Sequence, residues 1–116
     1  MASLSAPQRG EIWLADLDPT KGREQSGKRP VLVISVSAFN QSKAELVVIL
    51  PLTSTMRGIP WHVPINAPEG GLKNPSEVMC EAIRSVSKAR LVKRWGAVSP
   101  QSMAEVEDRM RILMNL

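Results

Sequence analysis

The chain has 116 residues, 43% of them hydrophobic and 22% charged, with a formal net charge of +4 at pH 7. This length supports one domain with a single apolar core. The one cysteine, Cys80, excludes an internal disulfide, which is typical of a reducing cytoplasm. The positive balance favours polyanionic partners such as nucleic acid without choosing among them.

Membrane and export signals are missing from the sequence. No apolar run approaches the roughly 20 residues of a membrane-spanning helix, and residues 1–8 lack the charged start and apolar stretch of a signal peptide. We therefore expect a cytoplasmic protein without a membrane segment. We expect it to fold as one domain over residues 1–116, with a flexible end at residues 1–8.

The first half of the chain reads as strands. Polar and apolar side chains alternate over residues 11–16, which predicts a strand. Pro30 opens a second strand that runs through Ser35 or Ser37, because proline is tolerated at a first strand position. After a turn at 37–41, the nearly continuous apolar run 44–52 predicts a central strand buried on both faces.

The second half adds shorter strands. Residues 61–65 predict a short strand, which Pro64 places at a sheet edge. Residues 66–76 hold two prolines and two glycines and predict a loop. Residues 77–86 predict a strand, and 93–98 predict one more, in which glycine 96 marks a bulge or a close approach.

The C-terminal segment has a helical pattern. Ser99 can cap a helix and Pro100 suits its first position, while Ser102 with Glu105 offers an alternative capping box. Four apolar residues recur at spacings of three and four and so share one face: Met103, Val106, Met110 and Leu113. Five or six strands followed by one helix predict a small, mostly antiparallel barrel or curled sheet with a helix packed against it.

Residues 18–30 form a long polar stretch with two prolines, two glycines and one interior carboxylate, Glu24. A connection of this length inside a small domain is usually functional or disordered. Its cations are Lys21, Arg23, Lys28 and Arg29. Arg29 stands where Pro30 and the next strand restrict the backbone, so its guanidinium could fork onto a phosphate and stabilise charge in a transition state. Glu24 could accept a proton. The alternative is a solvated turn with a loose ion pair.

Three other segments carry weaker signals. Thr53 and Ser54, at the exit of the central strand, could bond a phosphate oxygen or simply end the strand. Glu81 could act as a base if it is half-buried near cations, or lie on the solvent face. Residues 84–94 hold five cations without an acid, which can track a nucleic-acid backbone or form a solvated face: Arg84, Lys88, Arg90, Lys93 and Arg94.

Metal and nucleophile motifs are not recognisable in this sequence. With one histidine, His62, and one cysteine, the chain has no metal-ligand spacing, and we expect neither a metal nor a cofactor. We interpret His62 as a structural or surface residue on the edge strand. We interpret Cys80 as a small core side chain.

The motifs taken together resemble one family. They are RGEIW at 9–13, DPTKG at 18–22, EQ at 24–25, Gly27, RPVLV at 29–33, FN at 39–40, PLT at 51–53, Glu81, IRS at 83–85 and ARL at 89–91. In this order they resemble the MazF/PemK (Kid) toxins of bacterial toxin–antitoxin systems, over nearly the whole chain.

The resemblance implies an SH3-like antiparallel barrel of the CcdB/PemK type with a C-terminal helix, working as a homodimer. It implies a metal-independent endoribonuclease that cuts single-stranded RNA at short sequences. It further implies neutralisation by a cognate MazE-like antitoxin, acidic and partly disordered, which suits the +4 charge.

The resemblance also assigns roles to residues. Arg29 matches the central catalytic arginine, and Thr53 the threonine that assists it at the scissile phosphate. Glu24 and Gln25 match a loop pair associated with activity and RNA contact, and Glu81 matches an acidic residue near the site. The expected RNA contacts are Lys21, Arg23, Gln25, Lys28, Ser54 and Arg84. Ala82 and Met79 depart from relatives that carry glutamine and arginine at those positions.

This inventory fits cleavage of RNA by its own 2′-OH, which gives a 2′,3′-cyclic phosphate and a 5′-OH end. Arg29 would stabilise the phosphorane, Thr53 would bond a phosphate oxygen, and Glu24 or Glu81 would be the base. Two other functions stay open. One is a CcdB-like topoisomerase (gyrase) poison without nuclease activity, and the other is a non-catalytic nucleic-acid-binding barrel.

Overall fold

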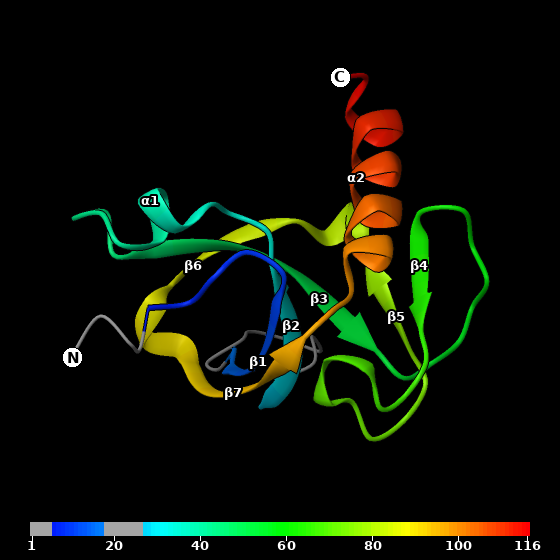
Figure 1. Cartoon of the computed structure of the whole chain (residues 1–116), viewed down its shortest axis with the longest axis horizontal. Helices are drawn as coiled ribbons and strands as arrows, with labels where there is room; N and C mark the ends of the chain where they lie inside the picture. Colours follow the sequence, from blue (N-terminus) through cyan, green and yellow to red (C-terminus); the bar gives the residue numbers. More distant parts are fainter. Residues whose placement is uncertain (1–5, 18–26) are drawn as a thin grey trace.

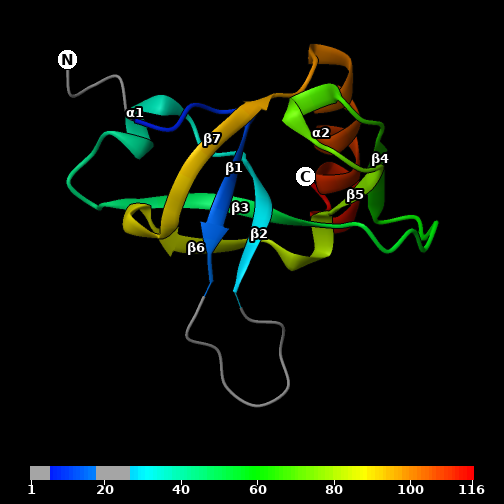
Figure 2. The same cartoon turned by 90° about the horizontal axis from the view of Figure 1, so that it is seen from below.

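The computed structural model of the chain describes residues 6–17 and 27–116. Within these ranges, seven strands form a single antiparallel sheet that curls on itself (Figures 1 and 2). The strands are β1 (Glu11–Asp16), β2 (Lys28–Val33), β3 (Leu46–Thr53), β4 (His62–Ile65), β5 (Ser76–Met79), β6 (Arg84–Ser87) and β7 (Leu91–Ala97). The helices are α1 (Ser37–Asn40) and α2 (Pro100–Met114), and single 3₁₀ turns are η2 (Glu69–Gly71), η3 (Cys80–Ala82) and η4 (Lys88–Arg90).

Strand β3 is the centre of the sheet. Along the order β4-β5-β3-β2-β1-β7 it pairs with β2 on one side, and on the other it pairs with β6 near its start and with β5 at its end. Its residues from Ile49 to Leu52 are buried. The predicted central strand is therefore confirmed, and so is the edge position of β4. Pro64 has no backbone N–H to donate to a neighbouring strand, which is tolerated at a sheet edge.

Several strand predictions need correction. The described residues form seven strands where five or six were predicted. Strand β2 ends at Val33 and not at Ser35 or Ser37, and β7 begins at Leu91 and not at Lys93. Strand β2 begins at Lys28 and not at Pro30, because Lys28 and Arg29 pair with Asp16 and Ala15 of β1. The predicted strand over 77–86 is instead two strands separated by η3. The chain turns there because β5 pairs with the end of β3 while β6 pairs with its start.

Helix α2 begins as predicted. The Ser99 side chain accepts a hydrogen bond from the backbone N–H of Ser102, and Pro100 occupies the first turn. Ser99 is thus the N-cap, and the alternative box at Ser102 is not used. The predicted turn at 37–41 is the one-turn helix α1.

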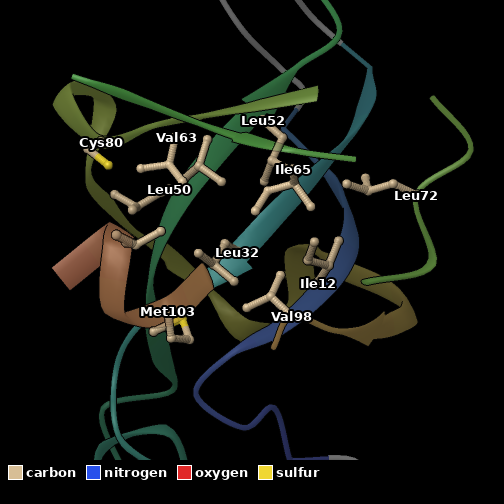
Figure 3. Close-up of a cluster of buried hydrophobic side chains, with 12 residues drawn as sticks. Ile12, Leu32, Leu50, Leu52, Val63, Ile65, Leu72, Cys80, Val98 and Met103 are labelled. Atoms are coloured by element: carbon tan, nitrogen blue, oxygen red, sulfur yellow. The ribbon is translucent and has the colours of Figure 1, made fainter. Parts of the chain in front are cut away.

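The helix covers the larger of two apolar clusters. Met103 and Val106 of α2 are buried in this cluster with side chains from β1, β2, β3 and β4, and Figure 3 shows Met103 among them. Met110 and Leu113 are partly buried and pack against the same cluster. The second cluster lies on the other face of the sheet, with Val31, Val33, Val47 and Ile49 among its members. Successive side chains of β2 and β3 point to opposite faces of the sheet, so these two strands contribute to both apolar clusters.

Backbone contact between two glycine positions fixes η2 against β7. A Cβ atom on Gly71 would lie 2.3 Å from the carbonyl oxygen of Trp95, and one on Gly96 would lie 2.7 Å from the carbonyl carbon of Gly70. The ladder between β1 and β7 also shifts register beside Trp95. The predicted close approach at Gly96 is confirmed, and it explains why a residue without a side chain stands there.

The N-terminal segment is tied to the sheet from Pro7 onward. Asn40 is fully buried, and its amide nitrogen donates to the carbonyl oxygens of Pro7 and Ser35. Residues 1–5 lie outside the described residues. Across the described ranges, no helix is both long and apolar enough to cross a membrane.

Candidate active site

Arg29 and Thr53 line the same pocket, although 24 positions separate them in the sequence. The pocket has a volume of about 280 Å³ and lies where β2 begins and β3 ends. Strands β2 and β3 pair antiparallel, with Val31 opposite Pro51. Two further steps along this register bring Arg29 level with Thr53, so strand pairing explains why these two side chains share the pocket.

Thr53 is the last residue of β3 and is half-buried. Its Oγ1 accepts a hydrogen bond of 3.1 Å from the backbone N–H of Thr55, which starts the turn after the strand. The hydroxyl hydrogen can then donate to an acceptor in the pocket, such as a phosphate oxygen.

Arg29 is half-buried and sits on a paired part of β2, opposite Ala15. Its neighbour Pro30 also lines the pocket. A guanidinium held on a strand loses less conformational freedom when it binds an anion than one on a loop. Arg29 and Lys73 are the cations among the described residues that line the pocket, and of the two Arg29 stands on a paired strand.

Sequence reasoning missed much of the pocket wall. Lys73, Asn74 and Trp95 line it together with Leu72, Ser76 and Thr55. The segment after η2 stands beside Trp95 because Gly71 and Gly96 bring the two backbones together. The available signal was the Gly70–Gly71 pair followed by Lys73 and Asn74, a polar loop anchored by glycine.

Glu81 does not line this pocket and is bonded to a residue outside it. It lies in η3, and its carboxylate contacts His62 Nε2 at 2.9 Å. Its side chain is 40% exposed. The structure therefore brings Arg29 and Thr53 together in one pocket and places Glu81 outside the residues that line it.

His62 joins two carboxylates, a role that sequence reasoning missed. Its Nδ1 contacts Glu77 Oε1 at 2.7 Å, and both side chains are almost fully buried. Burial acts to lower the pKa of His62, but the hydrogen bonds to Glu77 and Glu81 outweigh it and raise the pKa above the usual 6.5. The hydrogen bond from His62 in turn lowers the pKa of Glu77 against the effect of burial. An acid four residues before Glu81 and fifteen after the histidine was the only sequence trace.

The remaining predicted residues fall into two groups. Lys28 is exposed on β2, Ser54 is exposed and lines the pocket, and Arg84 is exposed on β6. Lys21, Arg23, Glu24 and Gln25 lie outside the described residues. Of the basic stretch 84–94, β7 carries Lys93 and Arg94, and Arg94 pairs with Glu11 at 2.8 Å.

The described ranges hold no cluster of three or more histidine, cysteine or acidic side chains that could bind a metal ion. Cys80 is buried in the larger core cluster, as predicted. Burial raises the pKa of its thiol to about 11, with a further contribution from the charge of Glu81.

Comparisons with known proteins agree with this geometry. Residues 8–114 match the family described as the PemK-like, MazF-like toxin of type II toxin–antitoxin systems. Endoribonuclease MazF9 of Mycobacterium tuberculosis is 32% identical over 94% of this chain and 97% of its own length. Endoribonuclease EndoA of Bacillus subtilis is 33% identical over 94% and 95%.

A solved structure of a MazE–MazF complex from Deinococcus radiodurans has a chain that superposes with a TM-score of 0.82 at 28% identity, covering 96% of this chain and 97% of that one. The predicted fold class and family are thereby confirmed. The chain belongs to the PemK-like and MazF-like toxins of type II toxin–antitoxin systems.

Proposed function

We propose that this protein is an endoribonuclease toxin that cleaves single-stranded RNA in the pocket of Arg29 and Thr53. The observation that carries the proposal is the meeting of these two side chains in one polar pocket at the ends of β2 and β3. Two relatives that span nearly the whole chain are named endoribonucleases, which supports the same reaction here.

The reaction requires no group beyond the RNA and the side chains. The 2′-OH of one nucleotide loses its proton and attacks the adjacent phosphorus, while the bond to the 5′-oxygen of the next nucleotide breaks. The products are a 2′,3′-cyclic phosphate and a 5′-OH end. Arg29 stabilises the charge on the phosphorane and supplies the proton to the leaving oxygen, and the Thr53 hydroxyl donates to a phosphate oxygen.

The general base that removes the proton of the 2′-OH is Glu24 or Glu81, and the two carboxylates have different surroundings. Glu81 has a partly exposed carboxylate engaged with His62, whereas Glu24 belongs to the segment that precedes Lys28. Rate against pH for Glu24→Gln and Glu81→Gln separates them. The variant that abolishes the acidic limb of the profile identifies the base, and an unchanged limb in both excludes both.

Partners follow from family membership and charge. A MazF chain is known in complex with MazE. We propose that this chain likewise binds an acidic, partly disordered antitoxin, which its +4 charge favours. We also propose a homodimer. Light scattering on the purified chain tests the dimer, and toxicity relieved by a co-expressed neighbouring reading frame tests the antitoxin.

The central experiment is cleavage of a long single-stranded RNA in EDTA, with the 5′ ends of the fragments mapped. We expect discrete cuts with 5′-OH ends, lost in Arg29→Ala and reduced about 10²–10³-fold in Thr53→Val. Lys43→Ala is the control and retains cleavage, because this exposed cation precedes the start of β3 whereas the pocket lies where β3 ends. Intact RNA from a folded wild-type protein, or an active Arg29→Ala variant, overturns the proposal.

A further inference from the structure

The turn that follows Thr53 is held by one buried carboxylate. Glu77 lies on β5 directly opposite Thr53 and is only 3% exposed. Its Oε1 accepts from the backbone N–H of Arg57 at 3.1 Å, and its Oε2 accepts from that of Gly58 at 2.9 Å. The acid is therefore an anchor for the turn and not a surface charge.

This anchor matters because the turn is otherwise in solvent. Residues 54–60 are exposed, and Met56 in their middle is 50% exposed. In the described part of the chain, the hydrogen bonds that tie the backbone of residues 56–58 to the sheet both end on Glu77. Without them, the exposed turn would be held only at its two ends.

His62 fixes the anchor in turn. Its Nδ1 bonds the same Oε1 that receives the Arg57 N–H, and its Nε2 bonds Glu81 on η3. The far end of the turn is secured separately, since Arg109 of α2 donates to the carbonyl oxygen of Pro60. A ring bonded at both nitrogens cannot rotate, so the Glu77 carboxylate keeps one orientation.

We infer that Glu77, oriented by His62, is a positioning residue that holds Thr53, Ser54 and Thr55 in place against the scissile phosphate. The inference rests on the proposed function. It also gives Glu81 a second role, as the outer partner of His62.

The test compares Glu77→Gln with the wild type for kcat and for the Kd of an uncleavable RNA carrying a 2′-deoxy nucleotide at the cut site. Glutamine has the same shape, but its amide NH₂ must face a backbone N–H donor, that of Arg57 in one orientation and that of Gly58 in the other. We expect kcat to fall roughly 10–100-fold through misplacement of Thr53, with Kd within about two-fold.

Glu11→Gln is the matched control. Glu11 is also a largely buried carboxylate. It accepts a hydrogen bond from the backbone N–H of Gln8 and forms an ion pair with Arg94. It lies, however, at the opposite end of β1 from the pocket. We expect it to lose stability without a change in kcat. An equal fall of kcat in both variants, or an unchanged kcat in Glu77→Gln, overturns the inference.

Two substitutions of His62 distinguish the contribution of its Nδ1, which bonds Glu77, from that of its Nε2, which bonds Glu81. Asparagine places its amide N–H near the position of Nδ1 and keeps the bond to Glu77, whereas glutamine reaches the position of Nε2 and keeps the bond to Glu81. We expect His62→Asn to retain more of kcat than His62→Gln. The reverse order would assign the effect to Glu81 and overturn the role of Glu77.

Amide hydrogen exchange keeps the inference testable if a variant folds poorly. Arg57 and Gly58 are exposed residues, but in the wild type their backbone N–H groups are bonded to Glu77, so we expect these groups to exchange more slowly than that of Met56. Equal exchange at all three overturns the anchor. A wild-type protein that cuts no RNA overturns the proposed function itself, whereas normal cutting by Glu77→Gln overturns only the inference.

Discussion

Single polar side chains inside this small domain hold distant segments together. Asn40 is an example, because its buried amide joins the segment at Pro7 to the connection between β2 and β3. Truncating it leaves buried carbonyl oxygens without a donor. We expect Asn40→Ala to lose about 1–3 kcal/mol of unfolding free energy in urea titrations. Gln101→Ala, on the exposed face of α2, should change it by less than about 0.5 kcal/mol.

His62 and Glu77 make stability depend on pH. The raised pKa of His62 means that its contribution is complete below 6.5 and is lost as the pH rises through the folded-state value. The lowered pKa of Glu77 means that its contribution is present above 4.5 and is lost as the pH falls. The carboxylates that face the ring are those of Glu77 on β5 and Glu81 on η3.

The window of greatest stabilisation by this network is therefore about pH 4.5 to 6.5. Thermal unfolding midpoints measured from pH 4 to 9 should decline above that window in the wild type. In His62→Asn, which cannot titrate, this decline should be smaller. An identical decline in both proteins would contradict the assignment.

At the scale of elements, the contact between η2 and β7 determines a wall of the pocket. A methyl group on Gly96 would meet the backbone of Gly70 and Gly71 at 2.7–3.0 Å, and backbone cannot move aside as a flexible side chain can. We expect Gly96→Ala to cost about 1–3 kcal/mol of stability and to disturb the pocket side of Trp95. Ala97→Ser, at the exposed neighbouring position, should be close to neutral, and urea unfolding of both variants checks the contrast.

The elements also indicate what could be read from the sequence. Helix α2 was predictable from its cap and periodicity, and β1 and β3 from their apolar patterns. The start of β2 was not, because Lys28 and Arg29 carry no strand pattern and are ordered by pairing with β1. The break at η3 was equally hidden, since it arises from β3 having two different partners on one side.

The candidate site could be predicted from the sequence only in part, because contacts between distant segments complete it. Arg29 and Thr53 could be identified from motifs, but Lys73, Asn74 and Trp95 join them through a backbone contact between remote glycines. The hydrogen-bond network of His62, Glu77 and Glu81 was missed because its members lie on three separate elements, β4, β5 and η3. In the sequence, each of them alone resembles a surface residue.

The whole molecule carries a net charge of +4, so its proposed affinity for RNA should depend on salt. Each phosphate contact adds about 0.7 to the slope of log affinity against log salt for a single strand. We expect Lys73→Ala, which removes a cation of the pocket, to lower that slope by about this amount. Asn74→Ala should leave the slope unchanged. Equal slopes for wild type and Lys73→Ala would place Lys73 away from the RNA backbone.

Cys80 gives this protein a built-in reporter. It is the chain's one thiol, it is fully buried among the side chains beneath α2, and its pKa of about 11 leaves almost no thiolate at neutral pH. A thiol reagent can therefore react only with molecules in which the core has opened. Labelling kinetics, with no engineered probe, would give the opening free energy of the native protein. If the proposed antitoxin binds, the slowing of that reaction when it is added would measure how strongly it stabilises the closed native state.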